Sequence, residues 1–126
     1  MRSSLLVVGL VLATLGGVAL AKEPKPVVPR NDPGRWSTRN DYPDWLTGGE
    51  QVVAFELTID TVGSISDCRI TESSGSRLLD NTTCSLLRTR ARFKAARDAD
   101  GNPTQGTYTN RVRWISWEHW RGHGGG

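Results

Sequence analysis

The sequence is poor in the side chains that enzymes most often use for acid–base and nucleophilic catalysis. It has two histidines, His119 and His123, and both lie in a glycine-rich C-terminal stretch rather than in a segment expected to form a pocket. No serine lies in a recognisable nucleophile elbow, and the pattern places no two carboxylates to share a site. We therefore predict that the protein is not an enzyme and binds no cofactor.

The C-terminal stretch, residues 118–126, leaves two interpretations for its histidines. Imidazoles four residues apart, as in His119 and His123, can share a transition-metal ion. The neighbouring glycines, however, leave such ligands unordered. A flexible tail without a metal is our prediction, and metal binding by the tail is the alternative.

Long apolar runs are equally scarce, and the sequence has one, at residues 5–20. It follows Arg2 and ends in the triplet Ala19-Leu20-Ala21, a combination typical of a secretory signal that is cut after Ala21. The alternative is an uncleaved inner-membrane anchor, but the run is short for a membrane helix and contains three glycines. We expect residues 1–21 to be a signal peptide and the exported chain, about 105 residues, to form one domain.

The sequence contains only two cysteines, Cys68 and Cys84. In an exported chain two cysteines form either a bridge or two loose thiols, and an oxidising compartment favours the bridge. No cysteine directly follows Ala21, which argues against a lipid-anchored mature end. With both cysteines in a bridge, no thiolate remains for catalysis.

The net charge is small, +3, but the charges are unevenly distributed. Residues 88–126 contain eight Lys or Arg against three Asp or Glu, whereas residues 22–87 contain seven against ten. A basic half in an exported protein indicates anionic envelope polymers or an acidic partner before it indicates nucleic acid, which we do not expect as a partner. A solvated charged face is the alternative.

Residues 22–40 contain four prolines and show no apolar periodicity, so they are predicted to form an extended, proline-rich linker. Trp36 is the exception, since it is large enough to dock on the domain. Residues 41–46 favour a short helix, with Pro43 in its first turn. The paired glycines Gly48 and Gly49 end it.

The remaining elements follow from periodicity. Residues 51–60 alternate between apolar and polar side chains and predict a strand, and a tight turn leads into a second strand at residues 65–73. Ile65 is out of phase with its strand, which suggests a bulge or a twist near the turn. Residues 77–92 have helical spacing with Ser76 as N-cap, and residues 107–117 alternate again. We predict an α+β fold: a three-stranded antiparallel sheet packed against one long helix, with a short helix before the first strand.

Several short motifs occur here in an order and spacing that resemble the C-terminal domain of the TonB energy-transducer family, over residues 41–117. The residues that carry the resemblance are Tyr42-Pro43, Gly49 with the alternating stretch 52–59, Gly63, Cys68-x-Ile70, Ser73-Ser74-Gly75, Leu79-Asp80, Arg90-Ala91-Arg92-Phe93, Gly101-Asn102-Pro103 and Arg111-Val112-Arg113-Trp114. The cysteine pair resembles a disulfide-bearing branch of that family.

The resemblance implies a periplasmic domain of a Gram-negative bacterium. Such a domain pairs its last strand with an extended peptide of an outer-membrane transporter and transmits force from a proton-driven motor in the inner membrane. An unpaired edge strand is suited to this mode of binding. Carried over by position, the partner-binding residues are Tyr42, Pro43, Asn110, Arg111, Val112, Arg113, Trp114, Ile115 and Trp117.

The last strand also contains two tryptophans of opposite parity. Trp114 and Trp117 should face opposite sides of the sheet, so that one lies in the core and the other is exposed. An exposed tryptophan beside arginines either anchors a peptide or glycan or covers the end of the sheet.

Two departures from the family pattern shape the functional hypothesis. The apolar run contains no histidine or charged residue, and a linker of about 20 residues reaches only about 60 Å. We therefore expect a stand-alone periplasmic relative that binds a transporter segment or another periplasmic protein. The alternative is an envelope-associated structural domain that binds peptidoglycan or anionic lipid through its basic half. A homodimer formed through the open edge strand is a further interpretation.

Overall fold

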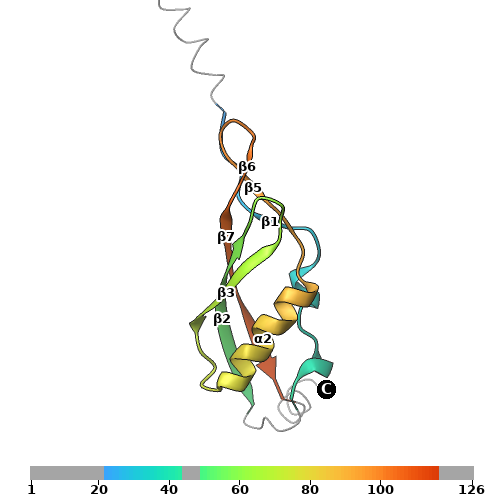
Figure 1. The fold of residues 1–126 in the computed structure, drawn as a ribbon. Helices are drawn as coiled ribbons and strands as arrows, with labels where there is room; N and C mark the ends of the chain where they lie inside the picture. Colours follow the sequence, from blue (N-terminus) through green and yellow to red (C-terminus); the bar gives the residue numbers. More distant parts are fainter. Residues whose placement is uncertain (1–21, 44–48, 117–126) are drawn as a thin grey trace, which may run out of the picture.

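The structure is a computed structural model that describes residues 22–43 and 49–116. Its centre is a three-stranded antiparallel sheet in the order β3-β2-β7, with one helix, α2, packed on one face (Figure 1). The main elements are β2 (Glu50–Ile59), β3 (Ile65–Glu72), α2 (Arg77–Arg90) and β7 (Gly106–Ile115). The predicted α+β fold is therefore confirmed.

The central strand β2 owes its place to its alternating apolar side chains. Val53, Phe55, Leu57 and Ile59 are each at most 1% exposed, and they share one face of the sheet. This face packs against the buried side of α2, including Leu87. The backbone of β2 pairs with β3 on one side and with β7 on the other. β2 is therefore the central strand of the sheet.

The turn between β2 and β3 depends on a glycine. Gly63 has a φ of 88°, and a Cβ atom at this position would lie 2.4 Å from the carbonyl oxygen of Phe93. The Asp60 carboxylate accepts hydrogen bonds from the backbone N–H groups of Val62 and Ser64. The pairing of β2 with β3 shifts in register between Thr58 and Ile59, and Ile59 lies opposite Ile65, so the irregularity that the phase of Ile65 predicted is present.

Helix α2 begins where the sequence predicted and ends two residues earlier. The Ser76 side chain caps it by accepting a hydrogen bond from the backbone N–H of Leu79. The helix ends at Arg90, and Ala91 is already extended because the chain continues into the short strand β4 (Phe93–Lys94).

The predicted bridge is present between Cys68 of β3 and Cys84 of α2. Cys84 lies in the buried stripe of the helix, and Cys68 is half-buried on the face of β3 that meets it. The disulfide therefore fastens an edge strand to the helix that covers the sheet.

Residues 22–43, which we call the N-terminal strap, lie against the domain. Strand β1 (Val28–Pro29) pairs with β4, and the backbones of Lys25 and Arg97 exchange two hydrogen bonds. Val27, Trp36 and Tyr42 of the strap are buried. The stretch predicted as a linker is thus extended but packed along the sheet, and the packed structure begins well before residue 41.

Two single-turn 3₁₀ helices shape the strap, η2 (Pro33–Arg35) and η3 (Arg39–Asp41). The second is the short helix before the first strand, and it ends at the residue where the sequence predicted a helix to begin. Residues 44–48, the rest of that prediction, lie outside the described residues.

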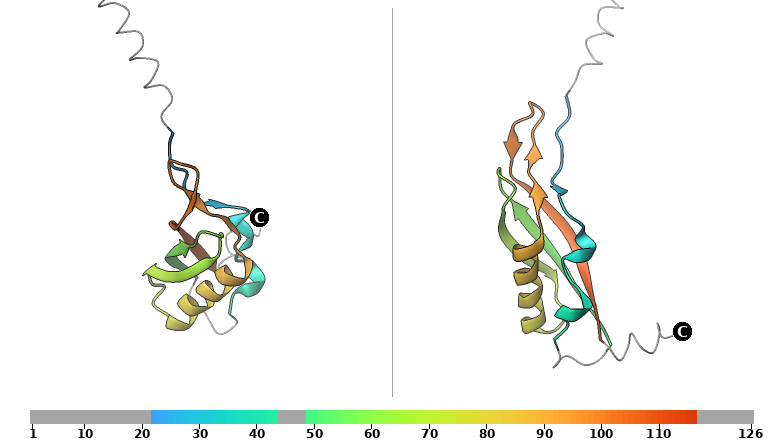
Figure 2. Two further views of the ribbon diagram at one scale, coloured as in Figure 1. Left: turned by 45° about the horizontal axis from the view of Figure 1, so that its top comes forward. Right: turned by 90° about the vertical axis from the view of Figure 1, so that its right-hand side faces the viewer.

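After β4 the chain forms a narrow hairpin from β5 (Ala96–Arg97) and β6 (Pro103–Thr104). Figure 2 shows this hairpin, the β2–β3 turn and the start of the strap at one end of the molecule. The predicted signal peptide (1–21), Trp117 and the tail (118–126) lie outside the described residues. Within the described ranges, no helix is both long and apolar enough to cross a membrane.

Candidate functional site

Strand β7 forms one edge of the sheet, as the sequence predicted for the last strand. It pairs with β2 over its whole length, from Gly106 opposite Ile59 to Ile115 opposite Glu50, without a register shift. In residues 22–43 and 49–116 no second strand pairs with it. This long, regular edge is the first component of the candidate site.

The direction of the backbone groups on β7 follows from one hydrogen bond. The N–H of Ser116 donates to the carbonyl oxygen of Gly49 at 3.0 Å, so that residue faces β2. Because the backbone of an antiparallel strand alternates, even-numbered residues of β7 face β2 and odd-numbered ones between 107 and 115 face outward. Consistent with this, the N–H of Arg111 is not in the ladder but bonds the side chain of Asn110.

The opposite edge of the sheet, β3, is less suited to accept a strand. Its pairing with β2 is interrupted twice, between Ala54 and Phe55 and again between Thr58 and Ile59. Such irregularities twist an edge and interrupt the spacing of its hydrogen-bonding groups, which hinders strand addition. Of the two edges, β7 is therefore the better template for an incoming strand.

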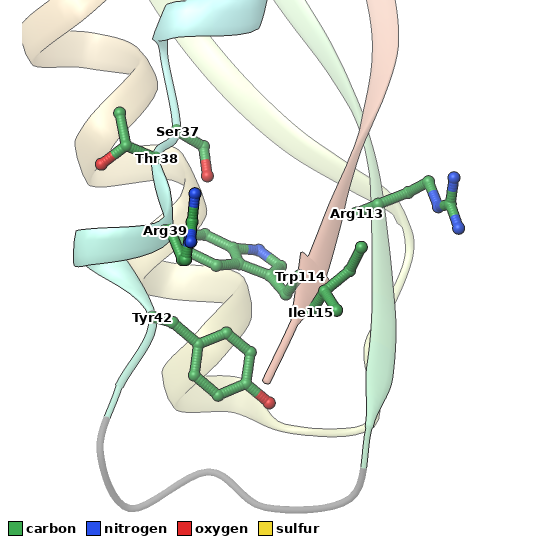
Figure 3. A pocket seen from close by; sticks show the side chains of 7 residues that line it. All are labelled: Ser37, Thr38, Arg39, Tyr42, Arg113, Trp114 and Ile115. Carbon is green, nitrogen blue, oxygen red and sulfur yellow. The ribbon is translucent and has the colours of Figure 1, made fainter. Parts of the chain in front are cut away.

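A pocket of about 170 Å³ opens beside the C-terminal end of β7 (Figure 3). One wall comes from the strap and the other from the strand, so residues far apart in the sequence face each other across it. The lining residues are Ser37, Thr38, Arg39, Tyr42, Arg113, Trp114 and Ile115.

Two aromatic rings form the floor of this pocket. The ring of Tyr42 lies 6.2 Å from that of Trp114, centroid to centroid, with the planes inclined by 59°. The indole N–H of Trp114 donates to the hydroxyl oxygen of Thr83 on α2 at 3.1 Å, and Trp114 is 2% exposed. The strand, the strap and the helix therefore meet at Trp114, which makes the floor of the pocket rigid.

The strap wall is held by a charged clamp. The Arg90 guanidinium donates to both oxygens of the Asp41 carboxylate, at 2.6 and 2.8 Å, and also to the carbonyl oxygen of Trp36. The hydrogen bonds from Arg90 hold the pKa of Asp41 well below its usual range. Nearby, the Asn31 side chain accepts from the Trp36 indole and donates to the Arg90 carbonyl oxygen.

The outer face of β7 carries arginines that are already paired. Arg113 Nε donates to a Glu50 oxygen at 2.7 Å, and this bond raises the pKa of the Arg113 guanidinium. Arg111 Nη2 lies 3.4 Å from a carboxylate oxygen of Glu72. These exposed pairs contribute little stability, but they neutralise the face beside the edge.

The structure brings together part of the predicted partner-binding set. Tyr42, Arg113, Trp114 and Ile115 line one pocket, whereas Asn110 and Arg111 lie farther along the strand, at a separate surface hollow. The Val112 side chain packs on the core, and Pro43 is half-buried beside Tyr42. Trp117 lies outside the described residues. The role of all these residues in partner binding stays a prediction.

Sequence reasoning missed the strap's share of the pocket, Ser37, Thr38 and Arg39. These residues fell in the stretch interpreted as a linker, because they show no apolar periodicity. Trp36, a large aromatic residue in a polar stretch, was the available signal that the segment docks.

The described residues contain no group of three or more His, Cys, Asp or Glu side chains placed to hold a metal ion. His119 and His123 lie outside those residues, so the predictions about the tail remain untested.

Comparison with known proteins adds one match. Residues 46–115, more than half of the chain, match the family model described as Gram-negative bacterial TonB protein C-terminal. The matched range contains the whole sheet and α2 but not the strap. A comparison with curated proteins found no match to the chain.

Proposed function

Because the chain belongs to the family of Gram-negative bacterial TonB C-terminal domains, we propose that it is a periplasmic protein-binding module of TonB-type transport. It pairs the outer edge of β7 with an extended segment of an outer-membrane transporter. The observation that carries this proposal is the ten-residue, uninterrupted edge of β7 beside an aromatic-floored pocket. The family is one of non-enzymatic protein-interaction domains, which supports the same conclusion.

Strand addition explains how such a site provides both affinity and selectivity. The outward N–H and C=O groups of β7 form main-chain hydrogen bonds with any extended segment that contains no proline at the matching positions. Side chains of that segment alternate between the two faces of the extended sheet. Those on the face of Trp114 and Tyr42 are placed to enter the pocket, so we expect an apolar or aromatic residue there.

The decisive test removes one outward backbone donor from β7. Arg113→Pro deletes the outward N–H but leaves the ladder with β2 intact, because proline is tolerated on the exposed side of an edge strand. Losing one hydrogen bond of about 1 kcal/mol should weaken binding of the transporter segment by roughly fivefold or more. Binding is measured by titrating a labelled synthetic segment of the transporter into the full chain.

The matched control is Arg113→Ala, which removes the same side chain and its bond to Glu50 but keeps the N–H. Any contribution of the side chain is lost equally in the two variants, so we expect Arg113→Ala to bind several-fold more tightly than Arg113→Pro. Proline at Val112 is not a suitable probe, because the N–H of Val112 faces β2 and its loss would damage the sheet. Equal binding by the Arg113→Pro and Arg113→Ala variants would contradict pairing through this edge.

The partner is identified by crosslinking in the periplasm with a photoreactive residue in place of Ile115, which lines the pocket. Recovery of an outer-membrane transporter supports the proposal. Recovery of only a second copy of the chain, or only of peptidoglycan or lipid, contradicts it.

A further inference from the structure

Positive side chains without ionic partners gather at the end of the molecule away from the pocket. The backbone of Lys25 in the strap pairs with that of Arg97 in β5, Lys94 of β4 lies opposite Val28, and Arg30 follows β1 directly. The backbone bonds between the strap and β4–β5 bring together cations that are about 70 positions apart in the sequence. This group, Lys25, Arg30, Lys94 and Arg97, is the cationic end.

These cations differ from the arginines on the sheet in whether they form salt bridges. Arg69, Arg111 and Arg113 each form a salt bridge with a glutamate. In the described ranges, by contrast, no residue of the cationic end has a salt bridge. Two nearby carboxylates, Asp60 and Asp98, cap their own turns by accepting backbone N–H groups, and Glu23 and Asp100 are exposed. These carboxylates keep their negative charge, and three of them, Glu23, Asp98 and Asp100, line a separate hollow together with Lys22 and Lys25. Among the described residues no carboxylate lines the groove formed by Arg30, Lys94 and Arg97, so positive charge predominates there.

Apolar surface lies among these cations. A groove of about 180 Å³ is lined by Arg30, Lys94 and Arg97 together with Val62 and Pro103. Val62 at the tip of the β2–β3 turn is 81% exposed, and Val28 is 47% exposed. An anionic sugar polymer would compensate the charges but would leave these valines in water. The headgroup boundary of a bilayer accommodates both.

The cationic end and the strand-binding pocket lie at different ends of the molecule. Lys22, the first described residue of the strap, lies beside Lys25 and Arg97. Figure 2 shows the strap starting beside the β5–β6 hairpin, whereas β7 runs away from it toward the pocket. Contact with a membrane at this end leaves the strand-binding pocket pointing away from the bilayer.

We propose that the cationic end docks on an anionic phospholipid surface, with Arg30, Lys94 and Arg97 at the phosphates and Val62 in the headgroup boundary. This surface is separate from the strand-binding edge, and it does not depend on the proposed function. Docking would hold the domain beside the membrane while β7 engages a partner.

The test measures flotation of the full chain, as exported, with two kinds of vesicles, phosphatidylcholine alone and an equal mixture with phosphatidylglycerol. The wild type should prefer the anionic vesicles, and the preference should weaken as salt is added. Arg30→Gln combined with Lys94→Gln should lower binding to anionic vesicles roughly fivefold for each charge removed, which corresponds to about 1 kcal/mol per cation. Val62→Ser, which changes no charge, should lower it a few-fold as well.

The matched control removes two charges elsewhere, Arg69→Gln with Arg77→Gln, on β3 and at the start of α2. It should bind anionic vesicles within about twofold of the wild type. Equal losses in the two double variants would show general charge attraction and overturn the proposal. Equal binding of the wild type to both vesicle types would overturn it too. The proposal would also fail if Val62→Ser bound anionic vesicles as well as the wild type while binding to purified peptidoglycan depended on Arg30 and Lys94. Near-ultraviolet circular dichroism checks that each variant is folded.

Discussion

Removing the Cys68–Cys84 bridge is expected to destabilise the domain more than any exposed substitution. The bridge closes a loop with a sequence separation of 16. In the chain-entropy model, opening a loop of this size costs about 3 kcal/mol at 25 °C. Total stabilities of small domains are about 5–15 kcal/mol, so this is a large fraction. It also releases an edge strand, β3, from the helix that covers the sheet.

The expected shift can be measured by thermal melting. In a domain of this size each kcal/mol corresponds to about 4–8 °C, so Cys68→Ala combined with Cys84→Ala should lower Tm by about 12–24 °C. Wild-type protein in reductant keeps both cysteine side chains as thiols but lacks the bond between them, and it should melt close to the double variant. Ser85→Ala, an exposed change next to Cys84, should leave Tm unchanged.

A fall of less than about 4 °C in both the reduced wild type and the double variant would refute this reasoning. It would mean that packing of α2 on the sheet, and not the covalent link, holds β3 in place.

Two further predictions concern the turn and the clamp. Gly63→Ala places a Cβ atom against the Phe93 carbonyl oxygen and should lower the free energy of unfolding in urea by about 2 kcal/mol or more. The control Gly75→Ala has a similar φ with nothing within 4 Å of the new Cβ atom, and it should lower the free energy of unfolding by only about 1 kcal/mol. Equal losses for the two variants would contradict the close approach at Gly63. Because Arg90 lowers the pKa of Asp41 in the folded state, the stability from this carboxylate is present above about pH 4 and is lost as the pH falls further. Thermal melts should therefore show a smaller acid-dependent loss for Asp41→Asn than for the wild type, and identical pH profiles would argue against the clamp.

The elements that the sequence predicted well are those with a strong local pattern. The alternation of Val53, Phe55, Leu57 and Ile59 indicated both the strand and its buried face, because side chains in a strand alternate whatever its neighbours are. Ser76 similarly marked the start of α2, since an N-cap acts within one turn.

The strap shows the limit of that reasoning. Its attachment depends on backbone pairing with β4 and on contacts such as the bond from the Arg92 N–H to Asn31, 61 positions away in the sequence. Neither feature produces a periodic pattern of apolar residues in the sequence, so the stretch was interpreted as a linker. The part of the pocket that the strap contributes could not be predicted for the same reason.

By itself, then, the sequence determined the central strand and the covering helix, because each depends on residue types along a short stretch. It also determined the pairing of the cysteines, because the chain contains only two. Only the tertiary structure decided which backbone groups of β7 face outward and which cations remain unpaired. Those properties arise from the register between strands and from contacts between distant residues, and residue order alone does not encode them in any local pattern.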